Sequence, residues 1–346
     1  MKKPHLVLGL SGGVDSAVSA LLLRESYQVY CLWLDIGLGG GEDAAAMADW
    51  LGLPFEKKDI RRELEHFVCQ PFVEDYLAGR TPLPCARCNP LVKFPALLQK
   101  AEELGGGYVA TGHYARVTQG PEGRILLRKG QPANDQSYML GRLTQSILCR
   151  TVFPLGGYEK VQVRALAAQR GVPVAHKPDS MEICFIPGGN YAAWLDARAQ
   201  TPPPGDFVDR EGRVLGRHKG IHHYTLGQGR GLGISGPHRY FVSDIDPARN
   251  TVTLSDGSDL SARRVFCTHP NWISIPGLEA PMEVTVRLRH SRTETPARLH
   301  PWKDGVALEL AVPARAPTPG QLAVFYQEDI VVGSAWIEKE DGDTWS

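Results

Sequence analysis

Two different hydrophobic patterns divide the chain. In the first part, apolar runs over Leu6–Leu8 and Tyr27–Leu34 predict buried strands, and helical spacing over Ala17–Leu23 and Asp43–Leu51 predicts the helices that follow them. This alternation is typical of an α/β fold with a doubly wound parallel sheet, whose ligands lie beyond the carboxyl ends of the strands. The same patterns predict a strand over Tyr108–Thr111 and further helices over Arg61–Leu77, Leu91–Leu104, Lys160–Gln169 and Asn190–Ala199.

The pattern changes at Thr201–Gly205, where three prolines and a glycine indicate a linker. Beyond it, short alternating runs separated by Asp-Gly and Pro-Gly turns predict small β-barrels or sandwiches. We therefore expect an α/β catalytic domain over residues 1–200, a central β domain over 205–270 and a C-terminal β-barrel domain over 275–346.

Composition and charge restrict the functional classes only slightly. The 346 residues include 38 basic and 38 acidic side chains, so any surface for a nucleic acid must be local. The most basic segment runs from Arg116 to Arg150, and a solvated surface explains it as well as a polyanion site does. Seven cysteines, an odd number, indicate reduced thiols. No apolar run has the length of a signal-peptide core or a membrane span, so we expect a cytoplasmic protein.

The stretch Gly9–Ser16 (GLSGGVDS) lies between the first predicted strand and the first predicted helix. Backbone N–H groups at a helix N-terminus bind phosphate, and the two glycines let the backbone approach a ligand closely. Serine hydroxyls add donors and the aspartate can hold a metal ion, whereas the lysine of a Walker loop is missing. An ordinary strand-turn-helix corner needs only one glycine. We therefore predict a phosphate-binding loop made of Gly9, Leu10, Ser11, Gly12, Gly13, Val14, Asp15 and Ser16.

Two further positions lie at the same predicted sheet edge. Leu34 ends the second strand, where its side chain would pack against a purine or fill the core equally well. Gly112 follows a later strand, and a residue without a side chain lets the backbone approach a nucleotide. Both are candidates for the nucleotide site.

Three cysteines lie in predicted loops. The extended prefix Thr81–Pro84 presents Cys85 and Cys88 in C-x-x-C spacing, and Cys184 lies in a second loop. A zinc site would need more ligands, for which His113 is the one obvious candidate, and a thioredoxin-type pair would begin a helix without the proline-rich prefix. The third interpretation is a pair of sulfur-handling thiols, because a thiolate or persulfide is a strong nucleophile at neutral pH.

The chain resembles the tRNA-specific 2-thiouridylases, a family of PP-loop ATP pyrophosphatases, over nearly its whole length. The resemblance implies that ATP adenylates the 2-carbonyl oxygen of the wobble uridine with release of pyrophosphate. A cysteine persulfide then supplies sulfur, which gives 2-thiouridine and AMP. The motifs that carry the resemblance are GLSGGVDS (9–16), CARCN (85–89) with Lys93-Phe94 after it, ATGHYARV (110–117), NDQSYML (134–140), DSMEICFIP (179–187), HHYTLGQGRGLGI (222–234), VRLRHSR (286–292) and TPGQLAVFY (318–326).

The resemblance also implies roles for individual residues. Gly9–Ser16, Leu34 and Gly112 match the ATP site, with Mg²⁺ on the phosphates. Cys184 matches the cysteine that carries the persulfide, and Cys88 matches the thiol that attacks it and leaves a disulfide between the two. A basic helical part over about 130–200 would bind tRNA. The individual matches to tRNA contacts are Leu83, Pro84 and Cys85 at the target base, and His113, Asn134, Asp135, Gln136, Arg289, His290 and Gln321 elsewhere.

Expected partners are tRNAs with a wobble uridine, such as those for Lys, Glu and Gln, and a persulfide donor such as a cysteine desulfurase or a sulfur-relay protein. The sequence departs from the family pattern at Leu83, where Asn is usual, and at Cys85, where many members have Asp. With this extra thiol, Cys85, Cys88 and Cys184 could hold a 4Fe-4S cluster, so a cluster-dependent thiolation stays open beside the persulfide route. Another PP-loop adenylating synthetase and a metal-stabilised RNA-binding module without catalysis are the remaining alternatives.

Overall fold

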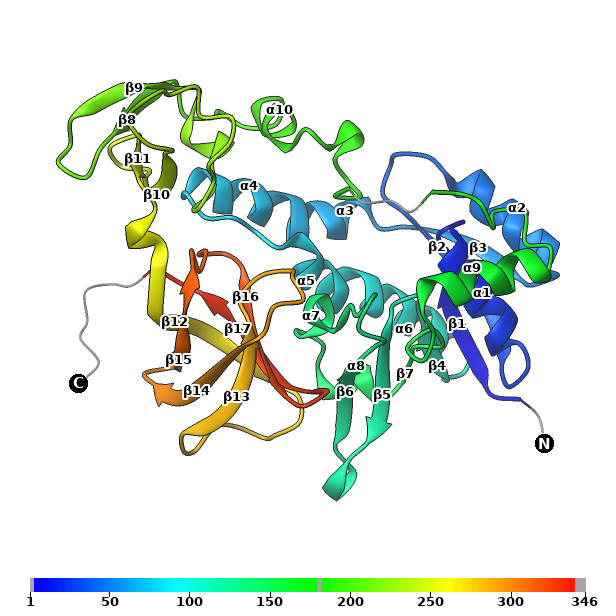
Figure 1. The fold of residues 1–346 in the computed structure, drawn as a ribbon. Helices are drawn as coiled ribbons and strands as arrows, with labels where there is room; N and C mark the ends of the chain where they lie inside the picture. Colours follow the sequence, from blue (N-terminus) through cyan, green and yellow to red (C-terminus); the bar gives the residue numbers. More distant parts are fainter. Residues whose placement is uncertain (1–2, 179–181, 340–346) are drawn as a thin grey trace.

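A five-stranded parallel sheet forms the centre of the N-terminal half (Figure 1). The computed structural model describes residues 3–178 and 182–339, so Asp179–Met181 of one predicted motif lie outside the described residues. The predicted doubly wound sheet is confirmed, with the first strand at its centre. The strands, in spatial order, are β3 (Phe55–Asp59), β2 (Gln28–Asp35), β1 (His5–Gly9), β4 (Tyr108–Ala110) and β7 (Thr151–Val152).

The two faces of this sheet are covered differently. Successive residues of a strand point to opposite faces, so Leu6 and Leu8 of β1 belong to one core and Val7 to the other. The second core continues from the sheet into the C-terminal barrel, where it includes Tyr326. The helices that cover the first face are α1 (Val14–Leu23), α2 (Gly41–Leu51) and α9 (Lys160–Gln169), and α6 (Phe94–Glu103) covers the second.

The helix predicted over Arg61–Leu77 forms with one irregularity. It consists of α3 (Arg61–Leu64), a π-helical turn (Glu65–Cys69) and α4 (Gln70–Leu77). Pro71 in the first turn of α4 has no N–H to donate, and its ring needs room in the turn before it. A π turn is wider than an α turn, so it accommodates the proline without ending the helix.

The C-x-x-C pair lies in a helix, so the prediction of a loop is wrong. Cys85 and Cys88 belong to α5 (Pro84–Cys88), which continues through a π-helical turn (Asn89–Lys93) into α6. Proline is favoured at the first helical position, where an N–H would have no partner, so Pro84 begins a helix that the sequence analysis expected it to prevent. Because Cys85 and Cys88 lie in a helix, their position no longer argues against a thioredoxin-type redox pair.

The remaining helical segments are short. In α10 (Tyr191–Asp196), part of the helix predicted over Asn190–Ala199, the Asn190 side chain accepts the N–H of Ala193 at 3.1 Å and caps the helix. Among the described residues, no helix is long and apolar enough to cross a membrane. The other short segments are α7 (Ser137–Leu140) and α8 (Gln145–Leu148), with 3-10 turns at Pro121–Gly123, Pro187–Gly189, Ile221–His223 and Ser258–Leu260.

A four-stranded sheet follows the proline-rich linker. Its core includes Phe207, Val242 and Leu254, against which Ile221 of the 3-10 turn Ile221–His223 packs. One pair of strands is parallel and the other neighbours are antiparallel. In spatial order the strands are β10 (Phe241–Asp246), β11 (Thr251–Ser255), β8 (Gly205–Val208) and β9 (Val214–His218).

The C-terminal strands close into a six-stranded barrel, which confirms the prediction of β-rich C-terminal structure. Closure comes from a second pairing of β12, with β17 as well as with β15, so these strands leave no open edge between them. The interior includes Leu299, Leu308 and Phe325. In spatial order the strands are β12 (Ser261–Trp272), β15 (Gly305–Arg315), β14 (Thr295–Trp302), β13 (Met282–Arg287), β16 (Leu322–Gln327) and β17 (Ile330–Ile337).

A hairpin from the N-terminal half extends the barrel sheet. Its strands are β5 (Ala115–Gln119) and β6 (Ile125–Lys129), and β6 pairs with β17. Two arginines of this hairpin, Arg116 and Arg128, bind the carboxylate of Asp329 at 2.7 and 2.6 Å. Part of the basic segment thus joins the two halves of the chain, a role that the sequence did not suggest.

Candidate active site

The loop between β1 and α1 is folded around two serine hydroxyls. Ser16 Oγ donates to the carbonyl of Gly13 at 3.0 Å and accepts the N–H of Ser11 at 3.2 Å, and the two hydroxyls are 3.1 Å apart. Gly12 has a φ of 73°, a left-handed conformation that favours glycine. Gly13 precedes α1 and has no side chain with which to cap it, so the first N–H groups of the helix can bind an anion.

Asp15, in the first turn of α1, is held by two side chains from distant parts of the chain. Lys160 Nζ lies 2.7 Å from each oxygen of the Asp15 carboxylate. Tyr114 Oη donates to Asp15 Oδ1 at 2.7 Å. The exposed fractions of the Lys160 and Asp15 side chains are 20% and 31%, so this ion pair is only partly screened by water. The ion pair places one cation and one carboxylate beside the predicted phosphate-binding loop.

These residues line a cavity of about 680 Å³ between the α/β domain and the barrel. This volume lies within the ~300–1,000 Å³ of small-molecule sites. One wall is the predicted phosphate-binding loop, and the opposite wall comes from the barrel. The residues that line it are Ser11, Gly13, Val14, Asp15, Tyr114, Pro132, Ala133, Asn134, Asp135, Gln136, Lys160, Lys177, Pro178, Arg287, His290, Ser291 and Arg292.

The segment Asn134–Gln136 forms a third wall and is fastened to Tyr114. Gln136 donates its backbone N–H to the Tyr114 carbonyl at 2.9 Å, and its Oε1 accepts the Tyr114 N–H at 3.0 Å. With its amide oriented to suit both neighbours, Asn134 accepts the backbone N–H of Lys160 at 2.7 Å. Gln136 and Asn134, which are expected to contact tRNA, therefore also hold Tyr114 and Lys160, the two partners of Asp15, in place.

Asp135 belongs to this wall, and its carboxylate is engaged by several partners. The side chain is 4% exposed, and it accepts hydrogen bonds from the N–H groups of Gly130 and Ser137 at 3.0 Å each. Arg287 of the barrel completes the set, with Nη1 2.5 Å from Asp135 Oδ2 and Nη2 2.7 Å from Glu294 Oε1. A buried ion pair thus fastens the cavity wall to the barrel.

The other two predicted ATP positions also lie at the sheet edge. A Cβ on Gly112 would lie 3.1 Å from Asp15 Cβ and 3.2 Å from Ser16 N, so the strand end packs tightly against the start of α1. Leu34, near the end of β2, packs against two core clusters, one of which contains Cys88. The glycine is therefore needed for packing, whether or not a nucleotide approaches it.

The fold brings Cys85, Cys88 and Cys184 together, close enough for each to affect the ionisation of another. The pKa of the Cys88 thiol is raised to about 11, chiefly by burial; Lys93 lowers it, and the neighbouring Cys184 and Cys85 contribute to the rise. Desolvation also raises the pKa of Cys184, although this residue is exposed at the surface. Backbone N–H groups stabilise both sulfurs, that of Lys93 at Cys88 and those of Cys184 and Phe185 at Cys184.

Lys93 is the cation beside these thiols. It lies in the π-helical turn after Cys88 and lowers the pKa of both Cys88 and Cys184. Burial lowers the pKa of His113 well below its ordinary value, and Lys93 lowers it further, so this imidazole is neutral at pH 7. Lys93 is therefore near both His113 and the thiols. Since His113 directly follows Gly112, the thiols lie beside the sheet edge that carries the predicted phosphate-binding loop.

The remaining candidate tRNA contacts lie at two places. Pro84 and Leu83 begin α5, and Gln321 donates to the carbonyls of Thr81 and Pro82 at 2.9 and 3.3 Å, which fixes this prefix against the barrel. On the barrel, His290 lines the cavity and the adjacent Arg289 is exposed.

Sequence reasoning missed four residues that the site depends on: Lys160, Tyr114, Lys93 and Arg287. Three of them lie in or beside motifs that the sequence analysis quoted, ATGHYARV, the segment after CARCN and VRLRHSR. Lys160 had no such signal, because it is the first residue of an ordinary amphipathic helix pattern. Only the spatial approach of α9 to α1 reveals its contact with Asp15.

Comparison with known proteins finds similarity along the whole chain. Models described as the tRNA methyl transferase HUP domain, the tRNA methyl transferase PRC-barrel domain and the aminomethyltransferase beta-barrel domain match residues 4–188, 193–256 and 262–337. A tRNA-specific 2-thiouridylase MnmA from Heliobacterium modesticaldum is 45% identical, covering 97% of this chain and 92% of the relative. A protein of that name from Lachnoclostridium phytofermentans is 42% identical, covering 98% of this chain and 100% of the relative.

Among solved structures, the NMN synthetase of Francisella tularensis is 21% identical, with a TM-score of 0.35, covering 51% of this chain and 67% of that chain. A likeness of this size supports no argument about function.

Proposed function

Because this chain belongs to the tRNA-specific 2-thiouridylase family, we propose that it replaces the 2-carbonyl oxygen of the wobble uridine of tRNA with sulfur, at the expense of ATP. Its substrates are tRNAs such as those for Lys, Glu and Gln, and it works in the cytoplasm with a persulfide donor such as a cysteine desulfurase or a sulfur-relay protein. One observation carries this proposal: thiols from two distant segments meet beside Lys93, at the sheet edge where the phosphate-binding loop ends.

The first step is adenylation of the uridine. The N–H groups at the start of α1 and the hydroxyls of Ser11 and Ser16 bind the β- and γ-phosphates that leave as pyrophosphate. Leu34 and Gly112 lie at the sheet edge where the adenosine would bind. The carboxylate of Asp15 offers the oxygen ligands that Mg²⁺ prefers, and such an ion would neutralise phosphate charge.

Lys160 has a specific role in this step. Without ATP its ammonium group neutralises Asp15, at 2.7 Å from both carboxylate oxygens. When ATP binds, the phosphates compete for Lys160, and its charge then stabilises the negative charge that develops on the α-phosphate. Tyr114 continues to hold Asp15 through its hydroxyl.

The second step transfers sulfur. The terminal sulfur of a Cys184 persulfide attacks C2 of the uridine, the C2–O bond breaks, and the oxygen leaves with AMP. Cys88 as thiolate then attacks Cys184 Sγ, and the electron pair of the broken S–S bond stays on the sulfur attached to C2. The thiocarbonyl is released and Cys88 and Cys184 are left as a disulfide, which a dithiol reductant must reduce before the donor restores the persulfide.

Lys93 makes this sequence feasible near neutral pH. Burial raises the pKa of Cys88 to about 11, so the thiol is protonated in the resting enzyme. The ammonium group of Lys93 favours the thiolate at both cysteines, and its backbone N–H lowers the pKa of Cys88 as well. We assign Lys93 to stabilising the sulfur anion that each transfer generates.

Because Cys85 is a third thiol beside Cys88 and Cys184, sulfur transfer has two possible routes. The donor set of three thiols fits three ligands of a 4Fe-4S cluster, and Cys85, Cys88 and Cys184 would hold it. When bound, such a cluster would supply or activate the sulfur. In the persulfide route, Cys85 instead lies beside the target base with Leu83 and Pro84, and we favour this route because Cys88 and Cys184 suffice for it.

The tRNA would approach from the side of the barrel. His290 and Arg292 line the ATP cavity, and Arg289 lies exposed next to them, so these side chains can bind the phosphates around the target base. Residues 130–200 would form the facing surface. Asn134, Asp135 and Gln136 all line the cavity, but the Asp135 carboxylate is engaged with Arg287, so this residue would act through the wall that it holds.

The test combines an unmodified tRNA transcript with ATP, cysteine and a cysteine desulfurase, and measures pyrophosphate and 2-thiouridine separately. Cys184→Ser should form no 2-thiouridine and still release pyrophosphate, whereas Lys160→Met should lower pyrophosphate release about 10²–10³-fold. Cys149→Ser, an exposed thiol outside the cluster, is the matched control. Absence of pyrophosphate with the unmutated enzyme would overturn the adenylation, and 2-thiouridine from Cys184→Ser would overturn the persulfide assignment.

The same assay separates the two sulfur routes. Cys85→Ser retains activity in the persulfide route and loses it in the cluster route. Anaerobic purification followed by iron and acid-labile sulfide analysis gives an independent answer. A colourless, iron-free enzyme with full activity would eliminate the cluster.

A further inference from the structure

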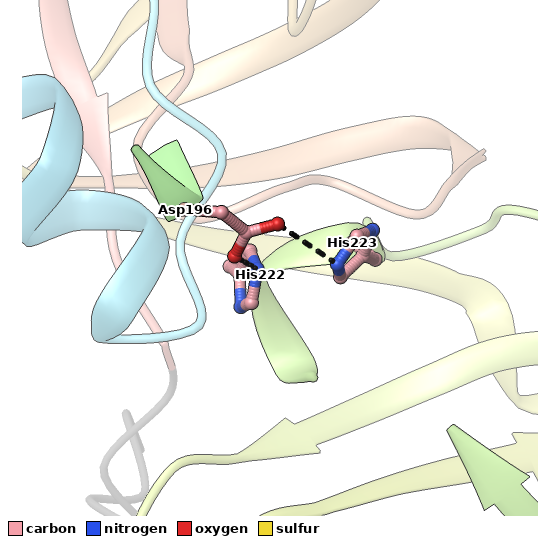
Figure 2. Close-up of side chains that lie close together, drawn as sticks. All are labelled: Asp196, His222 and His223. Atoms are coloured by element: carbon pink, nitrogen blue, oxygen red, sulfur yellow. Dashed lines mark hydrogen bonds and ion pairs between the residues drawn. The ribbon is translucent and has the colours of Figure 1, made fainter. Parts of the chain in front are cut away.

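Asp196, His222 and His223 form a compact cluster outside the proposed active site (Figure 2). His222 Nε2 lies 2.9 Å from Asp196 Oδ1, and His223 Nε2 lies 3.9 Å from Asp196 Oδ2. One potential ligand atom from each residue lies within 4.8 Å of the other two. None of the three lines the ATP cavity.

The convergence of the two rings is unusual for adjacent residues. Neighbours in a helical turn normally point in different directions. Here His222 and His223, in the 3-10 turn Ile221–His223, have ring centroids 4.3 Å apart and direct their Nε2 atoms at the two oxygens of one carboxylate. The three side chains therefore enclose one point in space, which a single hydrogen-bonded histidine–aspartate pair would not require.

We propose that Asp196, His222 and His223 form a binding site for a divalent transition-metal ion of the Zn²⁺ class. Two imidazole nitrogens and one carboxylate oxygen are the ligand set of many three-residue zinc sites, with water in the fourth position. Imidazole suits Zn²⁺ better than it suits Mg²⁺ or Ca²⁺, so the site discriminates against the Mg²⁺ that accompanies ATP. Ion binding would require the ligand atoms, which lie within 4.8 Å of one another, to converge further.

His222 offers one nitrogen to this site. Its side chain is 1% exposed, and its Nε2 contacts Asp196 Oδ1 at 2.9 Å. In the described part of the chain its Nδ1 has no hydrogen-bond partner, so it does not compete with Nε2 as a ligand atom. A metal ion would replace the Asp196 contact at Nε2, and its binding free energy would add to the free energy of folding.

The position of the site gives the ion a structural task. Asp196 ends α10, whose Leu195 packs in the same core cluster as Phe185, the neighbour of Cys184. The histidines belong to the central β domain. A metal ion would therefore tie the segment that carries Cys184 to that domain and restrict its motion.

The test uses the full chain with Cys85, Cys88 and Cys184 replaced by Ser, because thiols also bind zinc. Zn²⁺ titration by calorimetry should give one site per chain. Asp196→Asn and His223→Ala should each weaken binding roughly tenfold or more. His238→Ala, at an exposed histidine of the same domain, should leave it unchanged. Co²⁺ bound in place of zinc should show tetrahedral d–d bands without thiolate charge transfer.

The outcomes separate this proposal from the tRNA chemistry, because metal binding is measured without ATP or tRNA. The assignment would be overturned if Asp196→Asn and His223→Ala left Zn²⁺ binding intact. It would also be overturned if the chain with the three cysteines replaced by serine bound no Zn²⁺. A rise in melting temperature with Zn²⁺ that disappears in Asp196→Asn would support it in the unmutated chain, where the thiols remain.

Discussion

Replacement of Arg287 with methionine tests whether the barrel holds the wall of the ATP cavity. Arg287 Nη1 lies 2.5 Å from Asp135, and its other nitrogens lie 3.1 and 2.7 Å from Glu294. Lys129 Nζ also binds Glu294, at 2.6 Å. Methionine keeps much of the aliphatic volume and removes the charge, so Glu294 retains a cationic partner while Asp135 loses its own.

The expected loss of folding free energy in Arg287→Met follows from the burial of the Arg287–Asp135 pair. The exposed fractions of the Arg287 and Asp135 side chains are 9% and 4%, so water cannot replace the lost partner. Removal of one member of a buried pair costs about 3–5 kcal/mol, because the other charge is left uncompensated. The control is Arg298→Met, since Arg298 and Glu283 form a pair at 3.5 Å on the barrel surface, with exposed fractions of 53% and 80%. Loss of such a surface pair costs about 0–1 kcal/mol.

Urea unfolding followed by tryptophan fluorescence measures both variants and the double variant Asp135→Asn with Arg287→Met. The double variant should be little less stable than Arg287→Met alone, because the uncompensated charge is gone. ATP affinity should fall in Arg287→Met, since the wall fixes Tyr114 through Gln136. The reasoning is refuted if Arg287→Met behaves like Arg298→Met, or if the two substitutions at the pair are additive.

Other predictions concern the sheet edge and the thiols. Gly112→Ala should weaken ATP binding and destabilise the fold by about 1–3 kcal/mol, because its Cβ would press on Asp15, whereas Gly157→Ala, with open space around it, should do neither. Binding titrations and urea unfolding check this pair. The alkylation rate of Cys88 should keep rising with pH where a free cysteine, of pKa about 8.5, levels off, because burial raises the pKa of Cys88 to about 11. Lys93→Met should slow that alkylation at each pH, measured by peptide mass spectrometry with Cys149 as internal control; an unchanged rate would contradict the role of Lys93.

The parts that the sequence predicts well are those set by local patterning. The apolar run Leu6–Leu8 and the glycines of the loop after it indicate a strand, a turn and a helix, and the structure has all three. Short alternating runs such as Thr251–Leu254 likewise indicate the later strands. In each case neighbours in the sequence are neighbours in space, so the pattern contains the necessary information.

The sequence predicts poorly where a residue acts through a distant partner. Nothing near Lys160 indicates that it meets Asp15, and nothing near Arg287 indicates Asp135. The role of Pro84 is hard to predict for a different reason, since proline both ends helices and begins them, and only the residues after it decide which. Long-range ion pairs and this dual role of proline account for the main differences between prediction and structure.

These contacts give the barrel a role in the cavity wall as well as in the proposed binding of tRNA. Four of its residues, Arg287, His290, Ser291 and Arg292, line the cavity whose other wall is the predicted phosphate-binding loop. A barrel that only gripped tRNA would not need to bury Arg287 against Asp135. Because the same barrel face carries the exposed Arg289, tRNA bound there would contact the element that fixes the ATP wall. We therefore expect tRNA bound at this face to stabilise the wall of the proposed ATP cavity, so ATP should be cleaved slowly without tRNA.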